Sequence, residues 1–208
     1  MKLTHSPISA ASRRVTLTLH LLGVRVDERV VQLASAEDRA ALRALNPNNK
    51  VPVLEDGELV LWESHAIMTY LCARTPGQAL YPTELAARAD TDRWLHWISA
   101  HLSPAVGGLG FEHIWKQRIG QGPPDPAHVE RLLGQVRQFG EVLDRHLATR
   151  RWIVGDAVGL ADLSVAATLM HAVPGRVPLE PFRHVRALCG RVAELPAWRA
   201  TEPPQAAA

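Results

Sequence analysis

Residues 46–65, NPNNKVPVLEDGELVLWESH, contain the pattern that decides the fold of the first part of this 208-residue chain. Two short apolar runs, residues 51–54 and 59–61, flank residues 55–58, whose Asp-Gly pair is typical of a tight turn between antiparallel strands. The Asn and Pro residues before the first run are typical of turns. The stretch therefore predicts a loop followed by a β-hairpin.

The chain on either side of this hairpin alternates between strand and helix signals. A short strand is predicted at residues 2–5, followed by a helix whose apolar residues recur at helical spacing and which stops at Gly23. An extended segment over residues 26–33 and a helix over residues 36–45 complete the part before the hairpin. A further helix is predicted over residues 63–73. The order β-α-β-α-β-β-α indicates a mixed sheet covered by helices.

Beyond residues 75–83, which read as a linker, strand signals disappear and helical periods dominate. Helical segments are predicted over residues 84–102, 125–148, 160–172 and 180–193. We therefore predict two domains, an α/β domain at residues 1–76 and an all-α domain at residues 84–202. The Pro- and Ala-rich end of the chain, from Glu202 onward, is expected to fray.

Composition excludes several classes of protein. The chain is 47% hydrophobic, which is enough for a packed core, and it has 23 Lys and Arg against 21 Asp and Glu, a net charge of +2. The longest basic runs are the pairs Arg13-Arg14 and Arg150-Arg151, without the aromatic residues that stack on bases. Nucleic acid is therefore not an expected partner.

No metal site or membrane segment is expected from the sequence. The ten histidines form no HExxH or other metal-binding spacing, and Cys72 and Cys189 lie in no CxxC pair. The N-terminus has no apolar signal-peptide run, and no stretch reaches the roughly 18 apolar residues of a membrane span. These features favour a cytoplasmic protein in a reducing compartment.

Four motifs in order resemble the soluble, cytosolic-type glutathione S-transferase family, in particular its serine-type phi- and theta-like members. They are SAASRRV at residues 9–15, NPNNKVPVL at 46–54, LWESHAI at 61–67, and Gly-Asp at 155–156 followed by Gly-Leu-Ala-Asp at 159–162. The resemblance covers nearly the whole chain. It implies a thioredoxin-like N-terminal domain followed by an all-α helical domain, a homodimer, and reduced glutathione as co-substrate with no metal or redox cofactor.

Within this resemblance, Ser9 is the candidate catalytic residue, as the donor of a hydrogen bond to the thiolate of glutathione. Lowering a thiol pKa from about 8.5 by two units takes roughly 2.7 kcal/mol, and one hydroxyl donor to an anion supplies about 1.5–3 kcal/mol. The alternative is that Ser9 only caps the first helix. Ser6 and Ser12 compete for the role, although Ser9 fits the family spacing best, four residues before Arg13. No tyrosine precedes Tyr70 and no cysteine precedes Cys72, so the tyrosine- and cysteine-type members do not fit.

The resemblance also assigns the glutathione-binding residues. Glu63 and Ser64 open a helix, whose N-terminal N–H groups and dipole favour the γ-glutamyl carboxylate, while Glu63 faces the amine; simple helix capping is the alternative. A cis peptide bond between Val51 and Pro52 would turn the Val51 N–H and C=O toward the cysteinyl backbone, which could then pair like an added strand. A trans proline on an edge strand is the alternative, and the sequence does not separate the two. Lys50 could bind the glycyl carboxylate or be an ordinary loop lysine.

The sequence departs from the phi-like pattern just before Val51, where Asn48-Asn49-Lys50 replaces the usual Phe-Gly-Gln. The resemblance therefore does not extend to the contacts with the glycyl end of glutathione or to an aromatic residue that locks the dimer.

In the helical half, the Gly-rich residues 107–110 are predicted to interrupt the fourth helix. Phe111 and Trp115 follow them, four residues apart, at the place where the family lines its electrophile pocket; core packing is the alternative. Asp162 is predicted to be structural, at the third position of a helix whose N-cap, Gly159, lacks the usual hydroxyl.

The expected activity is conjugation of the glutathione thiolate to a hydrophobic electrophile, typical of detoxification. Two alternatives stay open at this point. One is a noncatalytic ligand-binding protein of the same fold, and the other is a glutathione-dependent isomerase, dehalogenase, etherase or peroxidase.

Overall fold

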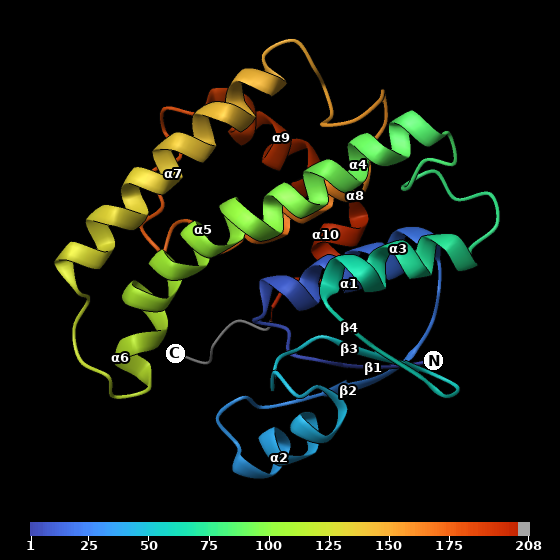
Figure 1. The fold of residues 1–208 in the computed structure, drawn as a ribbon, viewed down its shortest axis with the longest axis horizontal. Helices are drawn as coiled ribbons and strands as arrows, with labels where there is room; N and C mark the ends of the chain where they lie inside the picture. Colours follow the sequence, from blue (N-terminus) through green and yellow to red (C-terminus); the bar gives the residue numbers. More distant parts are fainter. Residues whose placement is uncertain (204–208) are drawn as a thin grey trace. The chain divides into compact units, whose positions relative to one another are not determined.

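The computed structural model describes residues 1–203, which divide into two units (Figure 1). Of these residues, the first unit contains Met1–Tyr81 and residues 195–203, and the second contains Pro82–Glu194. The helical domain expected at residues 84–202 thus differs at its end, because the last helix packs against the first helix of the chain.

The first unit is built on a four-stranded mixed sheet with the order β2-β1-β3-β4. β1 (Lys2–His5) pairs in parallel with β2 (Asp27–Val30), which is shorter than the extended segment predicted over residues 26–33. β3 (Val53–Asp56) pairs antiparallel with both β1 and β4 (Leu59–Trp62), so the predicted hairpin is confirmed.

Four helices complete this unit: α1 (Ala10–Leu22), α2 (Ala36–Leu45), α3 (Ser64–Arg74) and the short α10 (Pro196–Ala200). α1 ends where predicted, at Gly23, whose φ of 66° is readily adopted only by glycine. α1 packs on α3, and α10 packs on α1. The predicted order β-α-β-α-β-β-α is confirmed, and α10 is a further helix of this unit that the sequence did not predict.

The second unit begins with an uninterrupted helical run from residue 85 to residue 118 (Figure 1). Its parts are α4 (Leu85–Trp97), the π-helical turn η1 (Ile98–Leu102), α5 (Ser103–Gly110), a second π-helical turn η2 (Phe111–Trp115) and α6 (Lys116–Arg118). The interruption predicted at residues 107–110 was therefore wrong. Gly108 is instead a packing residue, because a Cβ there would lie 2.8 Å from the Leu132 side chain of the neighbouring helix.

That neighbour is α7 (Pro126–Leu147), and α8 (Leu160–Thr168) and α9 (Arg183–Ala193) follow it. The helix predicted over residues 160–172 ends earlier, at Thr168, and the helix predicted from residue 180 begins at Arg183. Asp144 of α7 explains the second boundary. Its Oδ1 accepts hydrogen bonds from the His184 and Val185 N–H groups, at 2.7 and 3.0 Å, and so satisfies the start of α9.

Two glycines of α7 should respond oppositely to alanine. At Gly140 an added Cβ would lie 2.5 Å from the buried Phe182 ring, so we expect Gly140→Ala to lower the free energy of unfolding by about 1–3 kcal/mol. At Gly134 a Cβ meets nothing within 4 Å, and Gly134→Ala should raise stability by about 0.5–1 kcal/mol, because alanine loses less backbone entropy. Urea unfolding of both variants measures the difference. Equal effects at the two positions would contradict this packing.

Candidate active site

The predicted site residues of the first unit come from three segments at one edge of the sheet. β3 runs antiparallel to β1 and β4, and Val53 at its start pairs with Thr4, the next-to-last residue of β1, and with Trp62, the last residue of β4. The start of β3 therefore lies at the same edge as the ends of β1 and β4. The turn before α1, the residues before β3 and the start of α3 all emerge there.

Ser9 is the N-cap of α1. Its backbone is extended, with φ −88° and ψ 121°, and its Oγ accepts a hydrogen bond of 3.3 Å from the Ser12 N–H. The capping alternative is therefore correct as a description of this side chain, but it does not exclude catalysis. A hydroxyl that accepts one bond retains its proton as a donor.

The competing serines are less accessible. Ser6 is 4% exposed and Ser12 is fully buried, and the Ser12 Oγ accepts a hydrogen bond of 3.3 Å from the Ser6 N–H. Ser9 is only partly buried. Burial thus favours Ser9 over its two neighbours as a group that can reach a ligand.

The loop before β3 has the predicted cis peptide bond between Val51 and Pro52. Val51 precedes the strand ladder, which begins at Val53, and Lys50 is exposed. Asn49, where the phi-like pattern has glycine, adopts a left-handed φ of 54°.

Asn46, which the sequence analysis treated only as a turn residue, holds this loop together. Its buried side chain donates to the Lys50 carbonyl at 2.7 Å and accepts from the Asn48 N–H at 3.0 Å. The loop that presents Lys50 and Val51 is therefore fixed from within.

Glu63 has an unusual backbone, with φ 71° and ψ 112°, and its side chain does not cap α3. A positive φ is strained for a residue with a Cβ, costs on the order of 1–3 kcal/mol, and tends to occur at functional sites. Ser64, next in the chain, is 4% exposed and begins α3. Simple capping therefore does not account for this pair.

Arg14 belongs to the candidate site, although no sequence motif indicated a role for it. It is 7% exposed, and its Nη1 donates a hydrogen bond of 3.1 Å to the Ser64 Oγ. Burial lowers the pKa of Arg14 to about 10, an effect that the nearby charge of Glu63 opposes. The feature that could have indicated its burial is its position in α1. Arg14 lies three residues before Leu17 and four before Thr18, so it shares a helix face with these two buried residues. Arg14 thus links α1 to the start of α3 and leaves the Ser64 hydroxyl proton available as a donor.

The two cysteines are free thiols, and burial raises the pKa of both Cys72 and Cys189 to about 12. They stay neutral near pH 7 and are poor nucleophiles.

Phe111 and Trp115 lie at the two ends of the π-helical turn η2 in the second unit. Phe111 is 36% exposed, and the Trp115 ring makes an edge-on contact with His171 at a centroid distance of 6.1 Å. Neither ring is fully buried, so core packing does not account for all of their surface.

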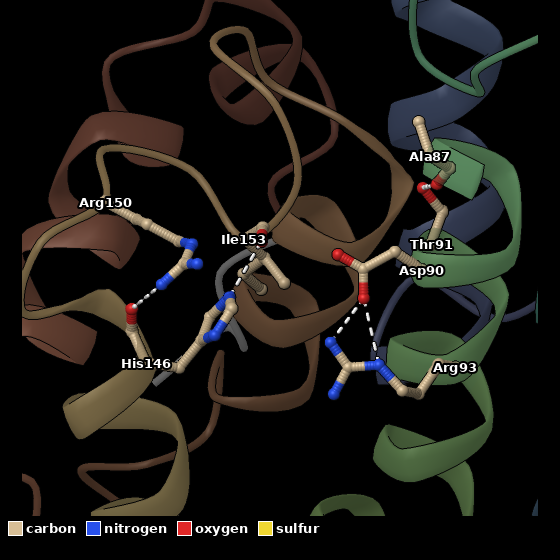
Figure 2. Close-up of polar contacts among 7 residues, drawn as sticks. All are labelled: Ala87, Asp90, Thr91, Arg93, His146, Arg150 and Ile153. Atoms are coloured by element: carbon tan, nitrogen blue, oxygen red, sulfur yellow. Dashed lines mark hydrogen bonds and ion pairs between the residues drawn. The ribbon is translucent and has the colours of Figure 1, made fainter. Parts of the chain in front are cut away.

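Asp162 is fully buried and holds the loop before α8. Its two carboxylate oxygens accept from the Ile153 and Gly159 N–H groups, each at 2.8 Å. The Ile153 carbonyl in turn accepts from His146 Nε2 at 2.8 Å (Figure 2). The predicted structural role is confirmed, as one half of a capping box, because Gly159 has no side chain to complete it.

Comparison with known proteins agrees with this arrangement. A family model described as the glutathione S-transferase N-terminal domain matches residues 3–79, and one for the C-terminal domain matches residues 126–200. "Glutathione S-transferase 3" of Zea mays is 33% identical over 211 residues, which cover 97% of this chain and 92% of the maize protein. The chain belongs to the glutathione S-transferase family.

Other relatives of this transferase agree. GstB of Escherichia coli K12, named a glutathione S-transferase, is 30% identical over 75% of this chain and 74% of its own length. The solved structure of a glutathione S-transferase III in apo form is 30% identical, with a TM-score of 0.83 over 96% of this chain and 94% of that one. The sequence-based expectation of a glutathione transferase with a two-part fold is confirmed at the level of the family.

Within residues 1–203, no cluster of three or more His, Cys, Asp or Glu side chains could hold a metal ion. In the same residues, no helix is both long enough and apolar enough to span a bilayer.

Proposed function

We propose that this glutathione S-transferase stabilises the thiolate of reduced glutathione at Ser9 and adds it to a hydrophobic electrophile. The observation that carries the proposal is the geometry of Ser9. Its Oγ accepts from the Ser12 N–H, and the residue is partly exposed and lies at the same edge of the sheet as Val51 and Ser64. Its proton is then available to donate to an anion at the start of α1, where the helix dipole also favours negative charge.

The remaining groups match the parts of glutathione. The start of α3 and the Ser64 hydroxyl suit the γ-glutamyl carboxylate, and Glu63 suits the amine. The Val51 N–H and C=O suit the cysteinyl backbone, which would pair like an added strand. The exposed Lys50 suits the glycyl carboxylate.

In the reaction, the sulfur lone pair of the thiolate forms a bond to an electrophilic carbon. With a halide, the leaving group departs with the electrons of the bond that breaks; with an epoxide or an isothiocyanate, those electrons stay on the substrate's own oxygen or nitrogen, which takes a proton from solvent. The thiol proton passes to solvent when the thiolate forms. These polar reactions need no metal or redox cofactor. A thiolate held in place beside a bound electrophile gains from proximity and orientation.

A homodimer in the cytoplasm, with a detoxifying role, belongs to the same proposal. The edge strand β4 supports the dimer, because Leu59, Val60 and Trp62 are each about 40% exposed. Exposed apolar side chains on an edge strand favour coverage by another surface, here a second copy of the chain.

Calorimetry with reduced glutathione tests the proposed binding site. Wild type should show saturable binding, and Ser64→Ala should weaken it by about 10-fold or more, because a hydrogen bond to a carboxylate contributes roughly 1.5–3 kcal/mol. Thr83→Ala, an exposed hydroxyl at the start of the second unit, is the control and should bind like wild type. The proposal fails if wild type shows no saturable binding at millimolar glutathione.

Phe111 and Trp115 form the proposed wall for the electrophile. Replacing either with alanine should change the relative rates with an aromatic halide, an isothiocyanate, an epoxide and a hydroperoxide. The affinity for glutathione should stay within about 1 kcal/mol of wild type, because the residues proposed to bind glutathione differ from those proposed to bind the electrophile. If the melting temperature falls steeply while the ranking of substrates is unchanged, the two rings are packing residues instead.

A further inference from the structure

Arg13, the neighbour of Arg14, is bound to the C-terminal helix. Its Nη2 donates a hydrogen bond of 2.9 Å to the Trp198 carbonyl, and its guanidinium carbon lies 3.6 Å from the centroid of the Trp198 ring. Arg13 is 5% exposed, whereas Trp198 is half-buried. One side chain of α1 thus makes both a polar and a stacking contact with one residue of α10.

The backbone of Arg13 is bound to Ser9. The Arg13 N–H donates to the Ser9 carbonyl at 2.9 Å, which is the first helical hydrogen bond of α1. The preceding Ser12 N–H donates to the Ser9 Oγ, and the Ser9 N–H donates to the Ser6 carbonyl at 3.0 Å. The orientation of the Ser9 hydroxyl therefore depends on the same turn of helix that carries Arg13.

Close packing alone does not fix the Arg13 side chain. It borders a hollow of about 230 Å³ in the first unit, whose other walls include His5, Thr16 and Glu202. Burial lowers the pKa of Arg13 to about 10, although the charge of Glu202 opposes this shift, so the guanidinium remains charged near pH 7. A buried cation that borders a hollow depends on its specific contacts, here those with Trp198.

We propose that Arg13 and Trp198 form a clamp between α1 and α10 that holds the first turn of α1, and with it the Ser9 hydroxyl, in position for the glutathione thiol. Arg13 is a positioning residue, because it acts through Ser9. The proposal rests on the function proposed above. The helix α10, which belongs to the same unit as Ser9, thereby contributes to activation of the glutathione thiol.

The clamp can be tested first without any substrate, by hydrogen exchange of the free enzyme. In Arg13→Met and in Trp198→Leu, the amides of Ser12 and Arg13 should exchange about ten-fold faster than in wild type, because the first turn of α1 opens more often. Trp198→Phe keeps a ring under the guanidinium and should restore protection. Arg93→Met is the matched control, since Arg93 is exposed, stacks on Trp94 at 4.9 Å and pairs with Asp90 in the second unit (Figure 2).

The second measurement is the pKa of bound glutathione, followed by thiolate absorbance and by the pH dependence of kcat. Both clamp variants should raise this pKa by about 0.5 and lower kcat at pH 6.5 by about three-fold, with the KM for glutathione within two-fold of wild type. Trp198→Phe and Arg93→Met should match wild type. Trp198→Leu leaves α1 unaltered, so it carries the test if Arg13→Met does not fold.

The two measurements separate the possible failures. Unchanged exchange in both clamp variants would overturn the inference. So would faster exchange with a wild-type thiol pKa, because the contact would then be structural only. If wild type itself forms no glutathione thiolate, the proposed function fails, and the inference fails with it.

Discussion

Replacing Ser9 with alanine is expected to raise the pKa of enzyme-bound glutathione by about 1–2 units, because the lost hydroxyl stabilises the thiolate and not the thiol. At a pH below the new pKa, less thiolate is present, and kcat/KM at pH 6.5 should fall by roughly 10- to 100-fold. The difference should shrink as pH rises and thiolate forms without help. Stopped-flow absorbance of the bound thiolate against pH measures the shift directly.

The neighbouring serines provide the controls for this experiment. Ser9→Thr keeps a hydroxyl and should retain more activity than Ser9→Ala. Ser6→Ala and Ser12→Ala remove buried hydroxyls and should leave the thiol pKa near its wild-type value. If Ser9→Ala titrates like wild type while one of these two variants loses the thiolate, the catalytic role belongs to that serine.

The sequence predicted the sheet and its order because the signals there are local. The Asp-Gly turn within residues 55–58 and the left-handed stop at Gly23 are decided by a few neighbouring residues. Boundaries that depend on distant residues were less accurate. α9 begins at Arg183 because Asp144, some forty residues earlier, binds its first N–H groups.

Glycine misled the prediction of the helical half for a similar reason. A cluster of glycines normally indicates a break in a helix. Here Gly108 is required because the Leu132 side chain approaches it closely. The loop at Gly175 also approaches the backbone of Gly110, since a Cβ added to Gly175 would lie only 3.4 Å from the Gly110 Cα. Close contact between elements far apart in sequence leaves no local pattern. The helix therefore continues through residues 107–110 where composition indicated that it would stop.

In the site, the motifs located the segments but not the interactions between them. The sequence indicated Ser9, Val51 and Ser64 as separate motifs, and the cis bond before Pro52 agreed with expectation. The strained φ of Glu63 left no sequence signal, since only tertiary contacts can hold that backbone. Arg14 was not predicted because a basic pair in a helix usually faces solvent. Here the buried Ser64 hydroxyl accepts a hydrogen bond from Arg14, and the nearby charge of Glu63 partly offsets the cost of burying the guanidinium.

Replacing Asp162 is expected to lower the free energy of unfolding more than the other substitutions described above. Asp162→Ala leaves the Ile153 and Gly159 N–H groups without their acceptor, and each unsatisfied buried donor costs about 1–3 kcal/mol, so we expect the free energy of unfolding to fall by about 3 kcal/mol or more. Asp156→Ala, an exposed carboxylate in the same loop, should change it by less than about 0.5 kcal/mol. Urea unfolding at pH 7 compares the two. A loss below 1 kcal/mol for Asp162→Ala would mean that water replaces the carboxylate.

The pH dependence of the same variants provides a second check on Asp162. Burial raises the pKa of this carboxyl to about 6 although hydrogen bonds from backbone N–H groups and the charge of Arg191 lower it, so its folded pKa lies above the usual value of about 3.9. A raised folded pKa means that the native state binds the proton more tightly, and the resulting stability is complete below about pH 4 and is lost as pH rises through 6. Asp162→Asn does not titrate at this position. The stability of wild type relative to Asp162→Asn should therefore be greater at pH 5 than at pH 7.5, and a difference that grows with pH would show that the N–H bonds outweigh burial.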